Sequence, residues 1–417
     1  MRKQLILPIA IFLFLIIGTV FVVLYGKGYR FGFELDKPKL QGTGLLVATS
    51  QPDGAQVFIN GHLTTATNNT LNLSPDTYRI KIVKVGYFPW EKTIKVQKEV
   101  VSVTGALLFA SAPKLESITE IGVSFPVIDP SFTKLAYTVA SQSARKNGVY
   151  ILDMASRPIL TLQSASTQIV NDTVDTFSQV KLSWSPDGKE LFAIITDSQN
   201  PESPTTYLLK TNGFNQNPQD VTETIENIIQ LFEKEIEDKE KSRIDGLNAK
   251  VKKLINENFK VLSWSMDETK ILYTASVSAK LPLIINPALI GSDSTPQERS
   301  IQKDSLYIYD IKEDKNFKLF DSMPNPQLLP LLAKPDLAPR DNSQLPLRWF
   351  PDSKHLLFVD NRKISIMEYD GTNNTIIYAG PFLDNYVFPW PDGSKIVILT
   401  NLGNTNITPN LYTIGLK

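Results

Sequence analysis

The stretch SWSPDGKELFAI, residues 183–194, recurs with variations at other places in the chain. Each copy has a Trp, then a short turn that contains Asp, then a run of apolar residues. Asp favours tight turns because its carboxylate bonds nearby backbone N–H groups, so each copy predicts a hairpin of two β-strands. The other copies are SWSMDETKILYT at 263–274, RWFPDSKHLLFV at 348–359 and FPWPDGSKIVIL at 388–399, and a degenerate fifth, VIDPSFTKLAYTV at 127–139, has Ile128 where the Trp would stand.

The spacing of the copies tests whether they are units of one architecture. A further strand-like run follows each hairpin, so one unit holds most of a four-stranded propeller blade. Trp349 and Trp390 are 41 residues apart, which fits one blade. Trp184 and Trp264 are 80 residues apart, and Trp264 and Trp349 are 85 apart. Each long interval therefore holds either a hidden blade or one blade with insertions.

The composition of the long intervals favours insertions. Residues 220–258 are rich in Glu and Lys and have apolar residues at helical spacing. Residues 278–303 and 324–345 are rich in Pro, Ser and Asn and are typical of long loops. We expect a mainly β fold with five blades, six being the alternative, and a helical insertion at 220–258. That insertion either packs on the propeller as a solvated amphipathic hairpin or docks a partner.

Closure of the ring is the next expectation. A propeller usually completes its last blade with a strand from the other end of the repeat array, and KLESITEIG at 114–122 is well placed to pair with LYTIGL at 411–416. The WSPDG turn before an apolar strand resembles the repeats of TolB-like and WD-type propeller proteins, over residues 113–417. This resemblance implies the fold and leaves the function open, because propellers serve as scaffolds, binding platforms and enzymes.

An uncharged apolar stretch lies near the N-terminus. Residues 5–25 read LILPIAIFLFLIIGTVFVVLY, and 16 of these 21 residues are Leu, Ile, Phe or Val. As a helix the stretch is about 31 Å long, which matches a bilayer core of roughly 30 Å. It is longer than a usual signal-peptide core and no Ala-x-Ala-like site follows it. We therefore expect residues 1–30 to hold a cytoplasmic tail and a membrane-spanning anchor that contacts lipid.

The charges beside this stretch predict its orientation. Arg2 and Lys3 favour a cytoplasmic N-terminus, and Lys27 and Arg30 on the other flank weakly oppose it. We expect a single-pass protein of the cell membrane with its C-terminal domains outside the cytoplasm. A soluble periplasmic protein, cleaved after the apolar stretch, is an alternative.

A small β domain is expected at residues 42–110. Apolar residues fall at every second position in AQVFIN, YRIKIVKV and TIKVQKEVVSV, as half-buried strands require. Asn60 and Gly61 directly after VFI are a strong hairpin signal. These features predict a compact antiparallel sandwich.

The same residues resemble the PEGA domain, a small β fold of bacterial and archaeal surface proteins named for its Pro-Glu-Gly-Ala turn. Pro52, Asp53, Gly54 and Ala55 stand in that place, followed by VFINGH, TYRIKIVKVGY and LLF. TTATNNT replaces the family's usual Gly-x-Thr-Pro in the middle loop. The resemblance covers residues 44–109 and implies a non-catalytic domain at the cell surface with envelope or carbohydrate contacts.

Three aromatic residues in GYFPWEK raise the question of sugar stacking. Tyr87, Phe88 and Trp90 would offer faces that pack on a sugar ring. The alternative, which we favour, makes Tyr87 a core residue and leaves only Trp90 near the surface.

Composition and motifs give little support to catalysis. Lys plus Arg and Asp plus Glu are both 43, so no net charge attracts nucleic acid, and the absence of Cys excludes thiolate chemistry. Only His62 and His355 are present, and we expect His355 to be partly exposed and incidental. No Gly-x-Ser-x-Gly elbow, P-loop or Gly-x-Gly-x-x-Gly follows a strand. We assign no catalytic, cofactor-binding, metal or ligand-binding residue and expect no cofactor.

The repeated acidic and aromatic residues have a structural interpretation. We expect the turn carboxylates to bond their own backbone rather than to act as acid, base or calcium ligand. We likewise expect the repeated Trp residues to pack between blades rather than to form a ligand cage. These residues are Asp187, Asp267, Asp352, Asp392, Trp184, Trp264, Trp349 and Trp390.

The sequence therefore predicts a membrane-anchored extracytoplasmic protein that binds or scaffolds and is not an enzyme. Its expected partners are envelope polysaccharides or other surface proteins. A glycosidase or lyase that uses propeller carboxylates is an alternative, because such an enzyme needs only two acidic residues. A second alternative is a soluble periplasmic TolB-like transport component. Oligomeric state and ligand identity are not predicted.

Overall fold

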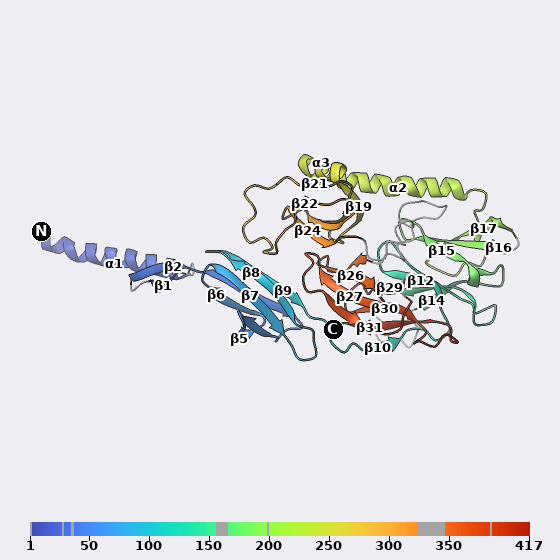
Figure 1. The fold of residues 1–417 in the computed structure, drawn as a ribbon, viewed down its shortest axis with the longest axis horizontal. Coiled ribbons are helices and arrows are strands. Elements are labelled where there is room, and N and C mark those ends of the chain that lie inside the picture. Colours follow the sequence, from blue (N-terminus) through green and yellow to red (C-terminus); the bar gives the residue numbers. More distant parts are fainter. Residues whose placement is uncertain are drawn as a thin grey trace. The chain divides into compact units, whose positions relative to one another are not determined.

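The computed structural model describes residues 2–26, 29–34, 37–155, 166–197, 200–322, 347–383 and 386–417, and the chain forms two compact units (Figure 1). The N-terminal unit comprises residues 1–111 together with 285–297. The C-terminal unit comprises residues 112–284 and 298–417. Residues 278–303, expected to be one long loop, are thus divided between the units, and the other expected loop, 324–345, lies outside the described residues.

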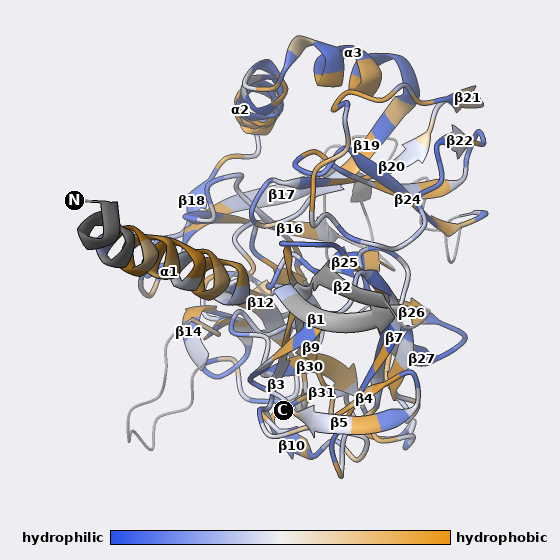
Figure 2. Cartoon of the chain, turned by 90° about the vertical axis from the view of Figure 1, so that its left-hand side faces the viewer, coloured by the Kyte–Doolittle hydropathy of each residue, from blue (hydrophilic) through white to orange (hydrophobic). Residues whose placement is uncertain are grey.

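Helix α1, Arg2–Gly26, opens the N-terminal unit. Its segment Pro8–Gly26 has 19 residues with a mean hydropathy of 2.7, and none of it is buried in the protein. Figure 2 shows apolar residues around the circumference of this segment. The helix is therefore long and apolar enough to cross a bilayer. A hairpin of β1, Tyr29–Glu34, and β2, Lys37–Gly42, follows the helix.

The small β domain has two sheets, with strand orders β6-β3-β9 and β5-β4-β7-β8. Apolar residues that alternate along β4, β7 and β8 meet in one core between the sheets. The expected purely antiparallel arrangement is wrong, because β3 and β9 pair in parallel, with Leu45 opposite Val101. The strands are β3 Gly44–Gln51, β4 Gln56–Ile59, β5 His62–Ala66, β6 Asn69–Leu73, β7 Asp76–Val83, β8 Trp90–Val96 and β9 Val101–Leu107.

Trp90 is buried in this domain, whereas the sequence predicted that it lies near the surface. Trp90, expected near the surface, is 4% exposed and packs in the core, because it occupies an inward position at the start of β8. Tyr87 packs against the same core and is partly buried. Trp90 therefore presents no face on which a sugar could stack.

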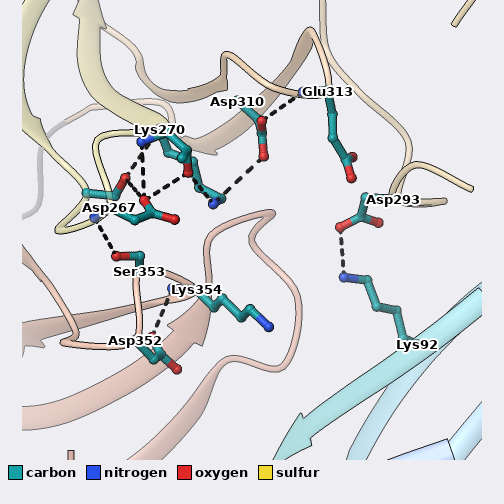
Figure 3. A network of polar contacts seen from close by, with 11 residues as sticks. Lys92, Asp267, Lys270, Asp293, Asp310, Glu313, Asp352, Ser353 and Lys354 are labelled. Atoms are coloured by element: carbon teal, nitrogen blue, oxygen red, sulfur yellow. Dashed lines mark hydrogen bonds and ion pairs between the residues drawn. The ribbon is translucent and has the colours of Figure 1, made fainter. Parts of the chain in front are cut away.

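A buried ion pair holds residues 285–297 within the N-terminal unit. Lys92 Nζ on β8 lies 3.0 Å from Asp293 Oδ2, and the two side chains are only 13% and 9% exposed (Figure 3). The backbone N–H of Lys95 also donates to Ser294 Oγ, at 3.0 Å. Burial by itself raises the pKa of Asp293, but the charge of Lys92 and hydrogen bonds outweigh it, so the pKa lies below its usual value.

The C-terminal unit contains five four-stranded antiparallel sheets among the described residues. Four of them consist of strands taken in chain order, with a short pair, β21–β22, inserted in one. Their strands are β11 Ser124–Ile128, β12 Lys134–Val139, β13 Gly148–Asp153 and β14 Ser166–Asn171; β15 Lys181–Trp184, β16 Glu190–Asp197, β17 Asn200–Lys210 and β18 Gln219–Asp220; β19 Phe259–Trp264, β20 Lys270–Ala275, β21 Ala279–Lys280, β22 Ser300–Ile301, β23 Leu306–Asp310 and β24 Lys315–Phe320; and β25 Leu347–Trp349, β26 His355–Asp360, β27 Lys363–Glu368 and β28 Thr375–Tyr378.

The fifth sheet closes the unit in the expected way. Its order is β10-β31-β30-β29, so β10, Leu115–Ser117, joins strands from the end of the chain. Glu116 lies opposite Thr413 in an antiparallel pair. The last strands are β29 Val387–Pro389, β30 Lys395–Thr400 and β31 Asn410–Gly415.

Apolar faces of successive sheets pack on one another. One cluster joins β11–β14 to β15–β17, and a second joins β11–β13 to the closing sheet. A third joins β20 and β23 to β25–β27, and the Arg348 guanidinium of β25 lies over the Phe388 ring of β29, 5.0 Å from its centroid. Sheets that pack face to face in series, with the first strand closing the last sheet, form a β-propeller. The number of blades stays a prediction.

Two helices stand between β18 and β19. Helix α2, Ile225–Asp245, ends at Gly246, and α3, Ala249–Asn258, begins where the Asn248 side chain accepts from Lys250 N at 2.9 Å. Helix α3 buries Val251, Leu254 and Ile255 against the sheet of β19, β20 and β23. Within α2, which is described throughout, only Ile229 is buried.

We predict that Lys92→Met destabilises the N-terminal unit by about 3–5 kcal/mol at neutral pH, because it leaves the Asp293 carboxylate buried without its cation. Since the pKa of Asp293 lies below its usual value, the penalty is present above about pH 4 and declines as the pH falls through the lowered pKa. Thermal unfolding of the full-length protein in nanodiscs at pH 7 and pH 3 measures both effects. Lys95→Met, on the same strand but exposed, is the matched control. An equal loss in the two variants would contradict the role of the ion pair.

Candidate functional site

The carboxylates of the repeated motif are bonded within their own turns. Asp187 Oδ1 accepts hydrogen bonds from Lys189 N at 3.0 Å and from Ser185 Oγ at 2.7 Å. The residue after each turn Asp has a positive φ, which Gly adopts without strain. The equivalent bonds reach Asp267 from Thr269 N, Asp352 from Lys354 N and Asp392 from Ser394 N. In the degenerate copy Asp129 accepts from Thr133 N and Lys134 N, four and five residues later.

These bonds set the protonation state of the turn carboxylates. Burial by itself raises the pKa of each carboxyl group, but hydrogen bonds within the turn and neighbouring positive charge outweigh it, so each pKa lies below its usual value. Such a group is ionised at neutral pH and holds no proton to donate as a general acid. The four residues concerned are Asp187, Asp267, Asp352 and Asp392.

The two histidines lie in different surroundings. His62 is exposed on β5. His355, expected to be partly exposed, is instead 3% exposed, because it is the first residue of the buried strand β26. Its Nδ1 lies 2.6 Å from Asp352 Oδ2, and its ring meets the edge of Phe350 at a centroid distance of 6.4 Å. The pair therefore fixes the turn between β25 and β26.

A polar network connects two neighbouring turns in the C-terminal unit (Figure 3). Asp267 N donates to Ser353 Oγ at 3.0 Å, which links the turn after β19 to the turn after β25. Lys270 Nζ lies 3.9 Å from Asp310 Oδ2 and 4.8 Å from the centroid of the Tyr369 ring. Burial, the largest influence, raises the pKa of Asp310. Sequence reasoning missed this pair because the motif offers no signal for a carboxylate at the end of β23.

A cavity of about 950 Å³ lies between the second half of α2, the strands β19 and β25, and the turn after β11. Its size is within the range of ligand sites. At its rim Arg243 Nε donates to Glu268 Oε1 at 2.7 Å. The lining includes apolar Phe132, Ile236, Ile244, Ile255, Val261, Leu262, Trp264, Met266, Leu347 and Trp349, and charged Glu237, Glu240, Lys241, Arg243, Asp245, Glu268 and Arg348.

The repeated tryptophans contribute unequally to this cavity. Trp184 packs between two sheets, as expected for blade packing, and lies outside the cavity lining. Trp264 and Trp349 also pack with the sheets but line the cavity. Trp390 is partly buried and has Lys395 Nζ 4.0 Å from its ring centroid. The four Trp residues occupy equivalent positions in the repeated motif, but only Trp264 and Trp349 line the cavity beside α2.

No ligand cluster of metal type forms in the described part of the chain, since no three His, Asp or Glu side chains there converge. The side chains that line the cavity offer hydrogen-bonding groups and apolar surface instead. It is the candidate functional site of the C-terminal unit.

Comparison with known proteins identifies the small β domain. Residues 43–108 match the PEGA domain family, which confirms the resemblance seen in the sequence. No curated protein matches the chain. The PEGA match covers the sandwich and leaves the C-terminal unit unassigned.

Solved structures similar to the chain include TolB proteins. TolB from Agrobacterium tumefaciens shares 13% identity over 71% of this chain and 73% of its own, with a TM-score of 0.21. TolB from Acinetobacter baumannii shares 14% over 81% of this chain and 59% of its own, with a TM-score of 0.21. An oligogalacturonate lyase in complex with manganese shares 10% over 82% and 83%, with a TM-score of 0.26. The propeller assignment rests on the sheet topology and not on these likenesses.

We predict that Asp352→Asn destabilises the C-terminal unit by about 1 kcal/mol at pH 7, a value kept low because the carboxylate is 30% exposed and screened by solvent. The lowered pKa of Asp352 contributes stability above the ordinary Asp pKa of about 3.9, and this contribution is lost as the pH falls through the folded value. The wild type and the variant should therefore converge as the pH falls below the lowered pKa of Asp352. Thermal unfolding of the full chain at several pH values measures this, and Asp392→Asn, which has no His partner in its turn, should change less. A pH-independent difference would contradict the argument.

Proposed function

We propose that this protein is a membrane-anchored binding and scaffold protein that holds its PEGA domain and propeller outside the cytoplasm. The observation that carries the proposal is a PEGA domain at 43–108 that follows, through one short hairpin, a helix able to span a bilayer. A membrane-spanning helix followed closely by a small folded domain is the order expected of a domain displayed at an envelope surface. Arg2 and Lys3 support a cytoplasmic N-terminus.

The proposed work is binding rather than catalysis. The repeated carboxylates are used within their turns and are ionised, which supports a structural role for them. The cavity beside α2 combines apolar walls with polar groups, as binding sites do. Envelope polymers and neighbouring surface proteins are the proposed partners, and the helix contacts lipid.

Helix α2 is the proposed docking element. Its first half contacts β16 through Phe232, whose ring centroid lies 5.6 Å from that of Phe192, and its second half reaches Trp264. Leu231, directly before Phe232, is 67% exposed. Helix α3 has a different role, because its buried face belongs to the core of the unit. Removing 220–258 altogether would uncover that core, so docking is better tested on α2 alone.

We predict that Val85→Cys reacts with a membrane-impermeant maleimide in intact spheroplasts. The chain contains no Cys, so a single added thiol reports on one site, and Val85 is 96% exposed in the PEGA domain. Lys3→Cys should react only after the membrane is permeabilised. Labelling is measured as a mass shift on gels. Protection of Cys at position 85 until permeabilisation would refute the proposed orientation, and release of the chain from the membrane fraction would refute the anchor.

We predict that Leu231→Glu weakens capture of the partner by at least tenfold and changes stability by less than about 0.5 kcal/mol, because the side chain is exposed. Photo-crosslinking in cells from an unnatural amino acid at position 234, followed by mass spectrometry, identifies the partner and measures its yield. Leu63→Glu, an exposed position on β5, is the matched control. Unchanged crosslinking in Leu231→Glu would assign α2 to packing only.

A further inference from the structure

One sheet of the PEGA domain has an aliphatic outward face. In β3 and β9 every second residue points into the core, and the residues between them point outward, with Leu45 opposite Val101 and Val47 opposite Val103. The side chains of Val101 and Val103 are on residues that are 51% and 65% exposed. Neighbouring aliphatic residues left in water mark a contact with a protein or a membrane.

Residues 289–291 of the N-terminal unit extend this face. Gly291 lies so close to β9 that a Cβ on it would be 3.4 Å from Val100 Cγ1. Directly before it, Leu289 and Ile290 are 46% and 74% exposed. The buried ion pair described above holds this segment on the domain. The aliphatic surface is defined here as Leu45, Val47, Val101, Val103, Leu289 and Ile290.

The sheet that carries the aliphatic surface has no charged residue in its strands. Strands β3, β6 and β9, each described along its whole length, read GLLVATSQ, NTLNL and VSVTGAL. Strands of the other sheet are charged. The charged residues of β7 and β8 are Asp76, Arg79, Lys81, Glu91, Lys92 and Lys95. Removing water from a charged group costs free energy, so a sheet without charge suits a face that apolar material covers.

The aliphatic surface begins at the turn that receives the chain from the membrane-length helix. Tyr29 stands three residues after Gly26, the last residue of α1, so their Cα atoms lie within about 11 Å of each other. The Tyr29 hydroxyl donates to Glu99 Oε1 at 2.6 Å, and Lys98 Nζ lies 4.7 Å from the centroid of the Tyr29 ring. Lys98 and Glu99 belong to the turn between β8 and β9, which leads directly to Val101. Since a headgroup layer is roughly 5–8 Å thick on each side of a bilayer, this turn is within reach of the headgroups above a spanning helix.

Backbone hydrogen bonds fix this connection to the domain. Glu99 N donates to Thr43 O at 3.0 Å, and Leu45 N donates to Val100 O at 2.9 Å. Thr43 is the single residue between β2 and β3. The β1–β2 hairpin therefore passes directly into the sheet, and the first residues of β3 and β9 stay near the end of the helix.

We propose that the aliphatic surface lies on the phospholipid bilayer that α1 spans, so that the PEGA domain itself contacts lipid. Its side chains would enter the zone between headgroups and acyl chains, as the apolar face of an interfacial helix does. Tyr29 and Lys98 suit the same level, because Tyr rings and Lys ammonium groups favour the membrane interface. The inference rests on the anchor in the proposed function and adds a second lipid contact, which would limit how the domain tilts over the membrane.

The test uses the full-length protein in nanodiscs of phosphatidylcholine and phosphatidylglycerol, with one chain per disc. The chain has no Cys, so Val103→Cys carries the only NBD fluorophore. We expect lipids with a nitroxide on the headgroup to quench this label at least threefold more than a label at Val85→Cys. Val85 is the matched control, because it is an exposed Val that follows the end of β7 opposite the turn before β9.

Two substitutions separate lipid contact from the behaviour of the label. Val101→Asp and Ile290→Asp each place a carboxylate on the aliphatic surface, and each should reduce the quenching at position 103 at least twofold. Both positions are exposed, so thermal unfolding should stay unchanged. Leu63→Asp, at an exposed aliphatic position of the other sheet, should leave the quenching unchanged.

Equal quenching at positions 85 and 103, or quenching at 103 that persists in both Asp variants of the aliphatic surface, would overturn the proposal. Shielding of the label only in discs that hold two chains would also overturn it and would assign the surface to a second copy. A chain that stays in the disc while position 103 is unquenched would keep the anchor and refute the lipid contact. A chain that leaves the disc would refute both, so the two failures are distinguishable.

Discussion

The antiparallel pairing of β10 with β31 is the constraint on which the C-terminal unit depends. It brings together Glu116 and Thr413, which are nearly three hundred residues apart in the chain. With β10 in place, the closing sheet is complete and its apolar face packs against β11–β13, where Phe388 and Val397 meet Leu135. Other apolar clusters likewise join neighbouring sheets, β11–β14 with β15–β17, and β20 and β23 with β25–β27. Closure therefore completes the burial that a row of separate sheets would leave unfinished at its ends.

The repeated turn was predictable because its chemistry is local. A carboxylate that bonds the N–H two residues later needs only the right residue and a neighbour that tolerates positive φ. Gly188 and Gly393 meet that requirement without strain, and Glu268 and Ser353 meet it at some cost. In the copy without a Trp, Asp129 instead accepts from the N–H groups of Thr133 and Lys134, four and five residues later, and the positive φ is at Phe132. The turn and the closing strand could thus be inferred from sequence, as could the membrane-length helix and the PEGA domain.

Other features depend on contacts that a sequence pattern does not contain. Trp90 is buried because the register of β8 turns it inward, and one residue of register decides between core and surface. The parallel pairing of β3 with β9 leaves the same alternation as an antiparallel pair would. Lys92 meets Asp293 across some two hundred residues of sequence, so nothing near either residue marks the contact. In the same way, the burial of His355 follows from packing around β26 and not from the turn that precedes it.

The α2 insertion explains why the candidate site lies where it does. The Trp184 indole donates to the backbone carbonyl of Val127 on the preceding sheet. At Trp264 the acceptor is instead a carboxylate from α2, an element outside the repeat. Natural chains are largely consistent across levels, and departures concentrate where function requires them. Trp349, in the next copy along, also lines the cavity beside α2 and β19. The same insertion that interrupts the repeat thus provides both a wall of the cavity and the hydrogen-bond partner of the Trp264 indole.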